Sequence, residues 1–107
     1  MKKMTVSAGS WIEKQNMKSD QRYRAFDIEE DNWKADVFVE IFNEELYTAR
    51  LAVNSTVYDG IFHRGELLGG DQRSFRNIPY SEDIVLDWAD SAIDRILEKA
   101  DKLRDNY

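Results

Sequence analysis

Apolar and polar residues alternate most regularly over residues 33–42, and this alternation predicts a β-strand. One face of the predicted strand is apolar and consists of Trp33, Ala35, Val37, Val39 and Ile41. After a polar run at residues 43–45, the alternation resumes over residues 46–53. Two alternating segments joined by a short polar connection are typical of a β-hairpin, so we expect these two segments to pair antiparallel.

Weaker patterns predict a strand on each side of this hairpin. Residues 23–28 alternate loosely and end at the acidic, turn-like run 29–32. Residues 56–62 follow the hairpin and are expected to form the next strand of a meander, with Gly60 marking a bulge or a close backbone approach.

The remaining segments before residue 80 have less regular patterns. Residues 4–8 are expected to form a short strand within an irregular leader. Residues 63–77 contain three glycines and three arginines, which favours a loop. Within and just beyond that loop, residues 74–78 are expected to add an edge strand.

A long amphipathic helix is predicted for residues 81–105. Ser81 suits the N-cap, and acidic residues follow in the first turn, where the helix dipole favours negative charge. Apolar residues recur every three or four positions to form one stripe: Leu86, Ala89, Ile93, Ile96, Ala100 and Leu103, widened by Val85, Ala92 and Leu97. This stripe is expected to cover the sheet. A coiled-coil seam is disfavoured because alanines occupy the stripe and the repeat is short.

These elements predict an α+β fold, in which a small antiparallel β-meander of about four strands is packed by one long C-terminal α-helix. The chain has 107 residues, of which 42% are hydrophobic, so it is long and apolar enough for one ordinary core. We therefore expect a single domain over residues 1–107. It comprises a weakly patterned leader at 1–22, the meander at 23–78 and the helix at 81–105.

The residue types exclude several kinds of site. Cysteine is absent and there is one histidine, which excludes disulfides, thiolate zinc sites and histidine-cluster metal sites. The acidic run 29–31 lacks the calcium-loop pattern, and the glycines at 65–70 lack the Gly-Lys-Ser/Thr ending of a phosphate-binding loop. We expect no metal and no cofactor.

The location expected from the sequence is the cytoplasm. The absence of cysteine fits a reducing compartment. The first residues lack the apolar stretch of a signal peptide, and no segment approaches the length of a membrane span.

Charge is distributed unevenly along a chain of net charge −6. Residues 1–24 hold six basic and two acidic side chains, while the remainder holds nine basic and nineteen acidic ones. Neutralising phosphates supplies most of the affinity for nucleic acid, so an acidic body of this kind is a poor nucleic-acid binder. A basic protein is the more plausible partner, and neither nucleic acid nor membrane is expected to bind directly.

Seven carboxylates of the predicted helix fall within a strip roughly 80° wide at about 100° per residue, and we call them the acidic row. Its members are Asp83, Asp87, Asp90, Asp94, Glu98, Asp101 and Asp105. Like-charged neighbours at these spacings cost about 0.2–0.5 kcal/mol each, offset in part by Arg95, Lys102 and Arg104. The row is either a solvated helix face or an electronegative surface for a basic partner. At one charge per roughly 5 Å it is too sparse to imitate duplex DNA by itself, which has one per about 1.7 Å.

No sequence pattern supports catalysis. His63 with Asp59 and either Ser55 or Ser74 would supply the residue types of a triad, but no nucleophile-elbow spacing accompanies them. Arg64, Arg73 and Arg76, together with Phe75, could form a loop that binds an anion or stacks on a nucleotide base. The simpler explanation for these arginines is that they keep the loop soluble and pair with acidic residues elsewhere in the protein. The protein is not expected to be an enzyme.

No stretch of the chain carries a family signature, so the function expected from the sequence rests on the acidic row. We expect a small acidic protein-binding inhibitor that occupies a basic, nucleic-acid-binding type of surface on a partner. Nuclease inhibitors, immunity proteins and phage anti-defence proteins are physical analogues. The residues expected to bind the partner are Asp83, Asp87, Asp90, Asp94, Glu98, Asp101, Glu44 and Glu45.

The alternative function depends on aromatic residues instead. Trp33 and Trp88 are expected in the core and Trp11 at an interface. Phe38 and Phe42 either pack beneath the helix or form an exposed patch on the sheet. An exposed patch would suit a non-catalytic oligomeric module, such as a homodimer, in which charge serves only solubility.

Overall fold

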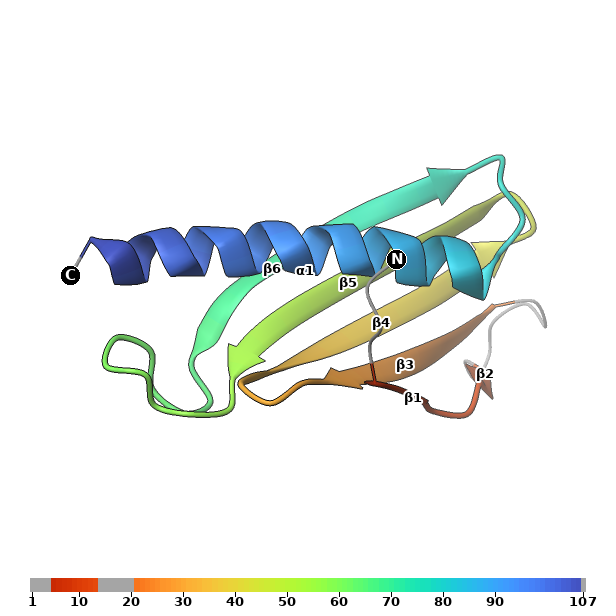
Figure 1. Ribbon diagram of the computed structural model, residues 1–107. Coiled ribbons are helices and arrows are strands. Elements are labelled where there is room, and N and C mark those ends of the chain that lie inside the picture. Colours follow the sequence, from red (N-terminus) through yellow and green to blue (C-terminus); the bar gives the residue numbers. More distant parts are fainter. Residues whose placement is uncertain (1–4, 14–20, 107) are drawn as a thin grey trace.

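The computed structural model describes residues 5–13 and 21–106, which form a β-sheet and one C-terminal α-helix (Figure 1). In chain order the elements are β1 (Thr5–Ala8), β2 (Ile12–Glu13), β3 (Arg22–Glu29), β4 (Trp33–Asn43), β5 (Leu46–Ser55), β6 (Leu67–Arg76) and α1 (Glu82–Asp105). In Figure 1, α1 lies in front of the sheet and crosses the direction of its strands obliquely.

Neighbouring strands all pair antiparallel, in the order β1-β3-β4-β5-β6 across the sheet. The two-residue β2 also pairs with β3, at the end of β3 that β1 leaves unpaired. The sheet is therefore five strands wide rather than about four. The predicted fold class, an α+β fold with an antiparallel sheet packed by one C-terminal helix, is confirmed.

The central hairpin forms as the alternation predicts. Val37 of β4 pairs with Leu51 of β5, and this register holds from Trp33 to Ile41. It then shifts by one residue, so that Asn43 pairs with Leu46 beside the connecting turn. There the Asn43 side-chain oxygen accepts a hydrogen bond from the backbone N–H of Glu45 at 2.7 Å. This local bond fixes the turn, and with it the register of the hairpin.

The predicted strand over residues 56–62 is wrong, because the chain turns there. The Asp59 carboxylate accepts hydrogen bonds from the backbone N–H groups of Ile61 at 3.0 Å and Phe62 at 2.8 Å. Gly60 between them has φ 96°, in the left-handed region that favours glycine. Because these amides donate to the Asp59 side chain, they cannot form the hydrogen bonds of a β-sheet, and a loop follows β5 here.

The loop predicted for residues 63–77 is wrong over most of its length, because β6 spans Leu67–Arg76 and contains Gly69 and Gly70. The edge strand expected at residues 74–78 is therefore the last part of a longer strand that ends at Arg76. A Cβ on Gly69 would lie 2.9 Å from the Cγ2 of Ile96 in α1. A Cβ on Gly70 would lie 3.0 Å from the carbonyl oxygen of Leu51. These glycines serve close approach between neighbouring elements, which the sequence alone does not distinguish from a turn.

One face of the sheet is buried against α1. Its buried side chains come from β3 to β6 and are Phe26, Ile28, Trp33, Ala35, Val37, Val39, Ile41, Tyr47, Ala49, Leu51, Val53 and Phe75. Trp88 of α1 joins Trp33 in this core, as predicted. Phe38 and Phe42 lie on the other face and are half-buried, so they do not pack beneath the helix.

The helix begins as predicted, with the Ser81 hydroxyl accepting a hydrogen bond from the backbone N–H of Ile84 at 3.4 Å. Its buried residues are Val85, Trp88, Ala89, Ala92, Ile93, Ile96 and Ala100. Leu103 belongs to the predicted stripe but is 48% exposed. The reason is that the last turns of α1 extend past the sheet (Figure 1).

We expect Gly69→Ala to lower the free energy of unfolding by about 1–3 kcal/mol, because the added methyl group overlaps Ile96. Urea denaturation followed by tryptophan fluorescence measures this change. In an Ile96→Ala background the same substitution is expected to cost less, since the overlapping atoms are gone. An equal loss in both backgrounds would contradict the packing argument.

Candidate functional site

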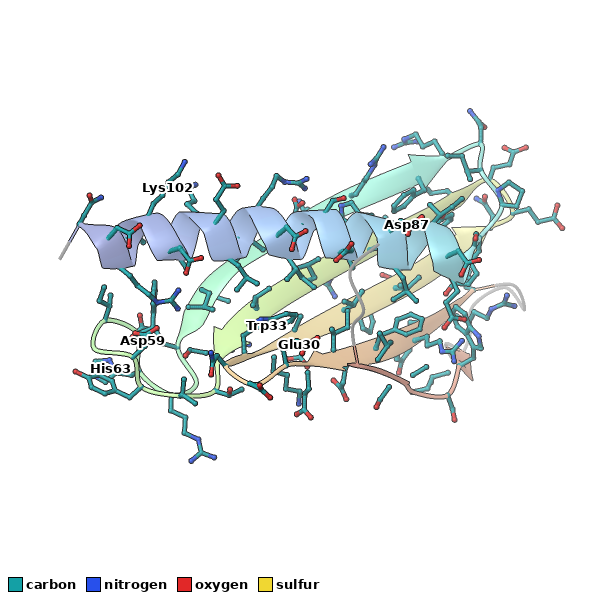
Figure 2. The ribbon with its side chains drawn as sticks, in the orientation of Figure 1. Glu30, Trp33, Asp59, His63, Asp87 and Lys102 are labelled. Atoms are coloured by element: carbon teal, nitrogen blue, oxygen red, sulfur yellow. The ribbon has the colours of Figure 1, made fainter. Side chains whose placement is uncertain are left out.

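The acidic row lies on the side of α1 that faces away from the sheet. All of its members except Asp90 are exposed, and the buried residues of α1 occupy the opposite side of the helix. Figure 2 labels Asp87 toward the N-terminal end of α1 and Lys102 toward the C-terminal end. The structure thus presents a line of surface carboxylates about 33 Å long.

Basic side chains partly neutralise the C-terminal half of the row. Lys102 Nζ lies 3.8 Å from an oxygen of Glu98, one helical turn away. Arg104 donates a hydrogen bond to Asp101 at 2.5 Å. Exposed pairs of this kind contribute little to stability, but they reduce the charge that a partner meets.

The N-terminal half of the row keeps its charge. Asp83 and Asp87 form no ion pair with any residue that the structure describes. Arg95, on the flank of the helix, instead pairs with Asp71 of β6 at 3.2 Å. Two exposed carboxylates near the start of α1 therefore lack an ion-pair partner among the described residues.

The β4–β5 turn adds two predicted residues at this end of the molecule. Glu44 and Glu45 are exposed on that turn. The backbone N–H of Asn77, shortly before α1, donates to the Glu45 carbonyl at 2.7 Å and ties the turn to the helix start. Long-range pairing thus brings Glu44 and Glu45 to the N-terminal end of the acidic row.

Other acidic residues are not brought to this surface. Residues 29–31 lie at the β3–β4 turn, which antiparallel pairing places at the opposite end of the sheet from the β4–β5 turn. Glu40 projects from the face of β4 that α1 does not cover. Neither group adds to the negative surface around Asp83.

Asp90 differs from the rest of the row because it is half-buried. Its Oδ1 atom is buried and has no hydrogen-bond partner within residues 5–13 and 21–106. It lies on the same flank of α1 as the half-buried Leu86 and Leu97, at spacings of four and seven residues. Asp90 is therefore poorly placed to meet a partner, and its burial is costly.

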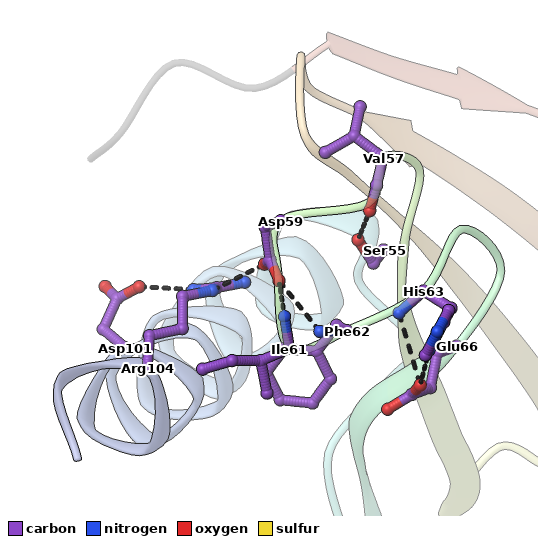
Figure 3. Close-up of polar contacts among 9 residues, drawn as sticks. All are labelled: Ser55, Val57, Asp59, Ile61, Phe62, His63, Glu66, Asp101 and Arg104. Carbon is purple, nitrogen blue, oxygen red and sulfur yellow. Dashed lines mark hydrogen bonds and ion pairs between the residues drawn. The ribbon is translucent and has the colours of Figure 1, made fainter. Parts of the chain in front are cut away.

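The loop after β5 is fastened to the end of α1 through Asp59 (Figure 3). Besides the two amides described above, Asp59 accepts a hydrogen bond from Arg104 Nε at 2.6 Å. The backbone N–H groups of Phe62 and Ile61, followed by Arg104, lower the pKa of Asp59 below its ordinary value of 3.8. The Asp59-Gly60 pair is a turn signal in the sequence, but its Arg104 partner is 45 residues away.

The residues considered for a triad have other partners in the structure (Figure 3). The Ser55 hydroxyl donates to the Val57 carbonyl at 2.6 Å. His63 is exposed and lies 3.3 Å from Glu66. Asp59 accepts a hydrogen bond from Arg104, so Ser55, His63 and Asp59 are not hydrogen-bonded to one another as a triad would be.

The arginine-containing segment is also not a base-stacking loop. Phe75 is only 4% exposed and stacks on Tyr47, with ring centroids 4.6 Å apart. Arg73 covers the Phe75 ring, its guanidinium carbon 5.2 Å from the centroid. The aromatic ring therefore belongs to the core and cannot receive a nucleotide base.

A cleft at one end of the sheet brings together residues that no sequence pattern connects. Arg22, Glu45 and Tyr80 are among the residues that line this cavity of about 660 Å³. They come from β3, from the β4–β5 turn and from the segment before α1, so only the folded chain makes them neighbours. No local signal could have shown that these three residues lie around one cavity.

Comparison with protein-family models, curated proteins and solved structures finds no match to this chain. Within residues 5–13 and 21–106, no group of three or more His, Asp or Glu side chains is arranged to hold a metal ion. The helix described here also lacks the apolar length required to cross a membrane.

We expect Asp90→Leu to raise the free energy of unfolding by about 1 kcal/mol, because it removes a buried carboxylate oxygen that has no partner. Asp87→Leu is the matched control, since it makes the same chemical change at an exposed position one turn earlier. Urea denaturation of both variants provides the comparison. If Asp90→Leu stabilised no more than Asp87→Leu, the burial of Asp90 would carry no cost.

Asp59→Asn is expected to destabilise the protein near neutral pH and to have less effect in acid. Because the folded-state pKa lies below 3.8, the interactions of the Asp59 carboxylate stabilise the fold above that pH. Their contribution is lost as the pH falls through the lower folded-state value. Urea denaturation at a series of pH values tests this, with Asp31→Asn as the exposed control. A stability difference from wild type that stayed constant with pH would contradict the expectation.

Proposed function

We propose that the protein is a small acidic binding protein that inhibits a partner by occupying its basic surface. The observation that supports the proposal is the exposed acidic row, whose members Asp83 and Asp87 have no ion pair with a described residue. A basic partner surface would supply the missing counter-charges.

The energetics of the row favour an intermolecular role. Successive carboxylates three or four residues apart repel one another by about 0.2–0.5 kcal/mol per pair in a helix. Binding to a basic surface turns this repulsion into attraction and also accelerates association through electrostatic steering. The two glutamates of the β4–β5 turn extend the negative surface beyond the start of α1.

The spacing of charges suggests what kind of basic surface fits. One carboxylate per helical turn is far less dense than the phosphates of a duplex. The proposed partner surface is therefore a protein groove or ridge with lysines and arginines spaced a helical turn apart. A partner that normally binds nucleic acid would present such residues, and the inhibitor would block them sterically and electrostatically.

The experiment compares capture of proteins from a bacterial lysate by wild type and by Asp83→Asn/Asp87→Asn. We expect wild type to retain a basic protein that is released by about 0.3 M salt, and the double variant to retain it at least about tenfold more weakly. Mass spectrometry identifies and quantifies the captured proteins.

The matched control is Glu29→Gln/Asp31→Asn, which removes the same charge from the β3–β4 turn at the other end of the sheet. This control is expected to capture the partner as wild type does. Equal capture by all three proteins would contradict the proposal and show that the acidic row is only a solvated helix face.

A second candidate, an oligomeric module, rests on the sheet face that α1 leaves uncovered. Tyr23 and Phe38 lie on that face with ring centroids 5.3 Å apart, and both are half-buried. Arg50 covers the Phe38 ring, with its guanidinium carbon 5.0 Å from the centroid. Sedimentation velocity separates the candidates: a dimer that forms equally at low and high salt would favour this face over the acidic row.

A further inference from the structure

The cleft at the end of the sheet is lined by two chemically distinct groups of residues. Its volume is about 660 Å³, within the range of small-molecule sites. Arg22 and Tyr80 bring hydrogen-bond donors to its lining, and Glu44 and Glu45 bring carboxylates. We call the first pair the inner donors and the second pair the glutamate rim.

Aromatic packing holds the inner donors in place. The guanidinium carbon of Arg22 lies 4.8 Å from the centroid of the Trp11 ring. Trp11 in turn meets Tyr80 edge to face, with centroids 5.2 Å apart. Tyr80 makes a second edge-to-face contact with the buried Tyr47 at 5.3 Å. Each inner donor is thus fixed by a neighbouring ring before any ligand binds.

The inner donors have unused hydrogen-bonding capacity. Arg22 Nε and the Tyr80 hydroxyl oxygen are both buried and have no hydrogen-bond partner among the residues that the structure describes. Buried polar groups in folded proteins are nearly always paired, so two unpaired donors beside one cavity call for an explanation. Burial, followed by the charge of Glu82, raises the pKa of Tyr80 to about 12, so its phenol keeps its proton at neutral pH and can donate.

The glutamate rim offers the complementary chemistry. Glu44 and Glu45 are exposed, and neither forms an ion pair with a described residue. Within the described part of the chain, the hydrogen bonds of this pair are made by the backbone of Glu45, with Asn43 and Asn77. Their carboxylates are therefore available to a cationic group. Ile41 and Pro79 supply apolar surface in the same cavity.

We propose that this cleft binds a small zwitterion such as a free amino acid, with its carboxylate toward the inner donors and its ammonium group toward the glutamate rim. A simple anion would meet the repulsion of two glutamates, and a simple cation would leave the inner donors unpaired. A molecule with both groups satisfies each part of the cleft. The proposal goes beyond the inhibitory function above and does not depend on it.

The probe for this site is L-phenylalanine, which combines the two charged groups with an apolar ring. A ligand of about 12 non-hydrogen atoms in an open cleft is expected to bind with a dissociation constant on the order of 1 mM. Titration of the ¹⁵N-labelled full chain should shift the backbone amide signals of residues around the cleft saturably. Phenethylamine and 3-phenylpropanoate, which each lack one charged group, should bind at least about fivefold more weakly.

Two variants test the two sides of the cleft. Tyr80→Phe removes one donor, keeps the ring and should not lower the melting temperature, because the hydroxyl has no partner to lose. Glu44→Gln/Glu45→Gln removes the charge of the rim. Each is expected to weaken L-phenylalanine binding about fivefold or more, and Glu29→Gln/Asp31→Asn, the matched charge control, should leave it unchanged.

The outcomes separate clearly. Saturable binding that both variants weaken and the control leaves intact would support the zwitterion site. Absence of saturable shifts up to tenfold above the expected dissociation constant, or unchanged affinity in either variant, would overturn it. Equal affinity for phenethylamine or 3-phenylpropanoate would also overturn it, because one charged group would then suffice. None of these results tests the proposed inhibitory function, which is tested separately by the capture experiment with the Asp83→Asn/Asp87→Asn variant.

Discussion

α1 packs against one face of the sheet at close range, and the positions of the other surface features follow from this contact. Small residues make the approach possible: Ala89 and Ala92 lie on the buried side of the helix, and Gly69 of β6 leaves room for Ile96. Each larger aliphatic side chain buried there contributes about 1.5–3 kcal/mol relative to exposure. Because the helix can bury only one stripe, its remaining surface is fixed toward solvent.

The acidic row is the consequence of that orientation. Lys102 and Arg104 compensate part of its C-terminal half, while Asp83 and Asp87 near the start have no ion pair with a described residue. Arg104 has a structural role as well, since it joins the end of α1 to the Asp59 loop where the helix has passed the sheet. At the C-terminal end of α1 the basic residues pair with the acidic row and also hold the Asp59 loop. The carboxylates at the N-terminal end are the ones that we propose bind a partner.

The proposed inhibitory surface and the proposed zwitterion cleft meet at the β4–β5 turn. Glu44 and Glu45 extend the acidic row beyond the helix start and also line the cleft. The two proposals are distinguishable because Asp83 and Asp87 contribute only to the first, and Tyr80 only to the second. If both hold, a ligand in the cleft would neutralise part of the acidic surface and so couple the two sites.

The sequence by itself determined the elements whose patterns are local. Alternation defined β4 and β5, the 3.6-residue repeat and the Ser81 cap defined α1, and the same periodicity placed the acidic row on its outward side. Where a role depends on a distant residue, the local pattern was insufficient: Gly69 resembles a turn residue, but the structure places Ile96 against it. The strand predicted for residues 56–62 failed for a local reason instead, because the Asp59 side chain accepts hydrogen bonds from the amides of Ile61 and Phe62. Only the tertiary structure could decide that Asp90 is half-buried and that Arg22 lies beside Tyr80, because burial and unpaired donors are properties of neighbours that the chain brings together by folding.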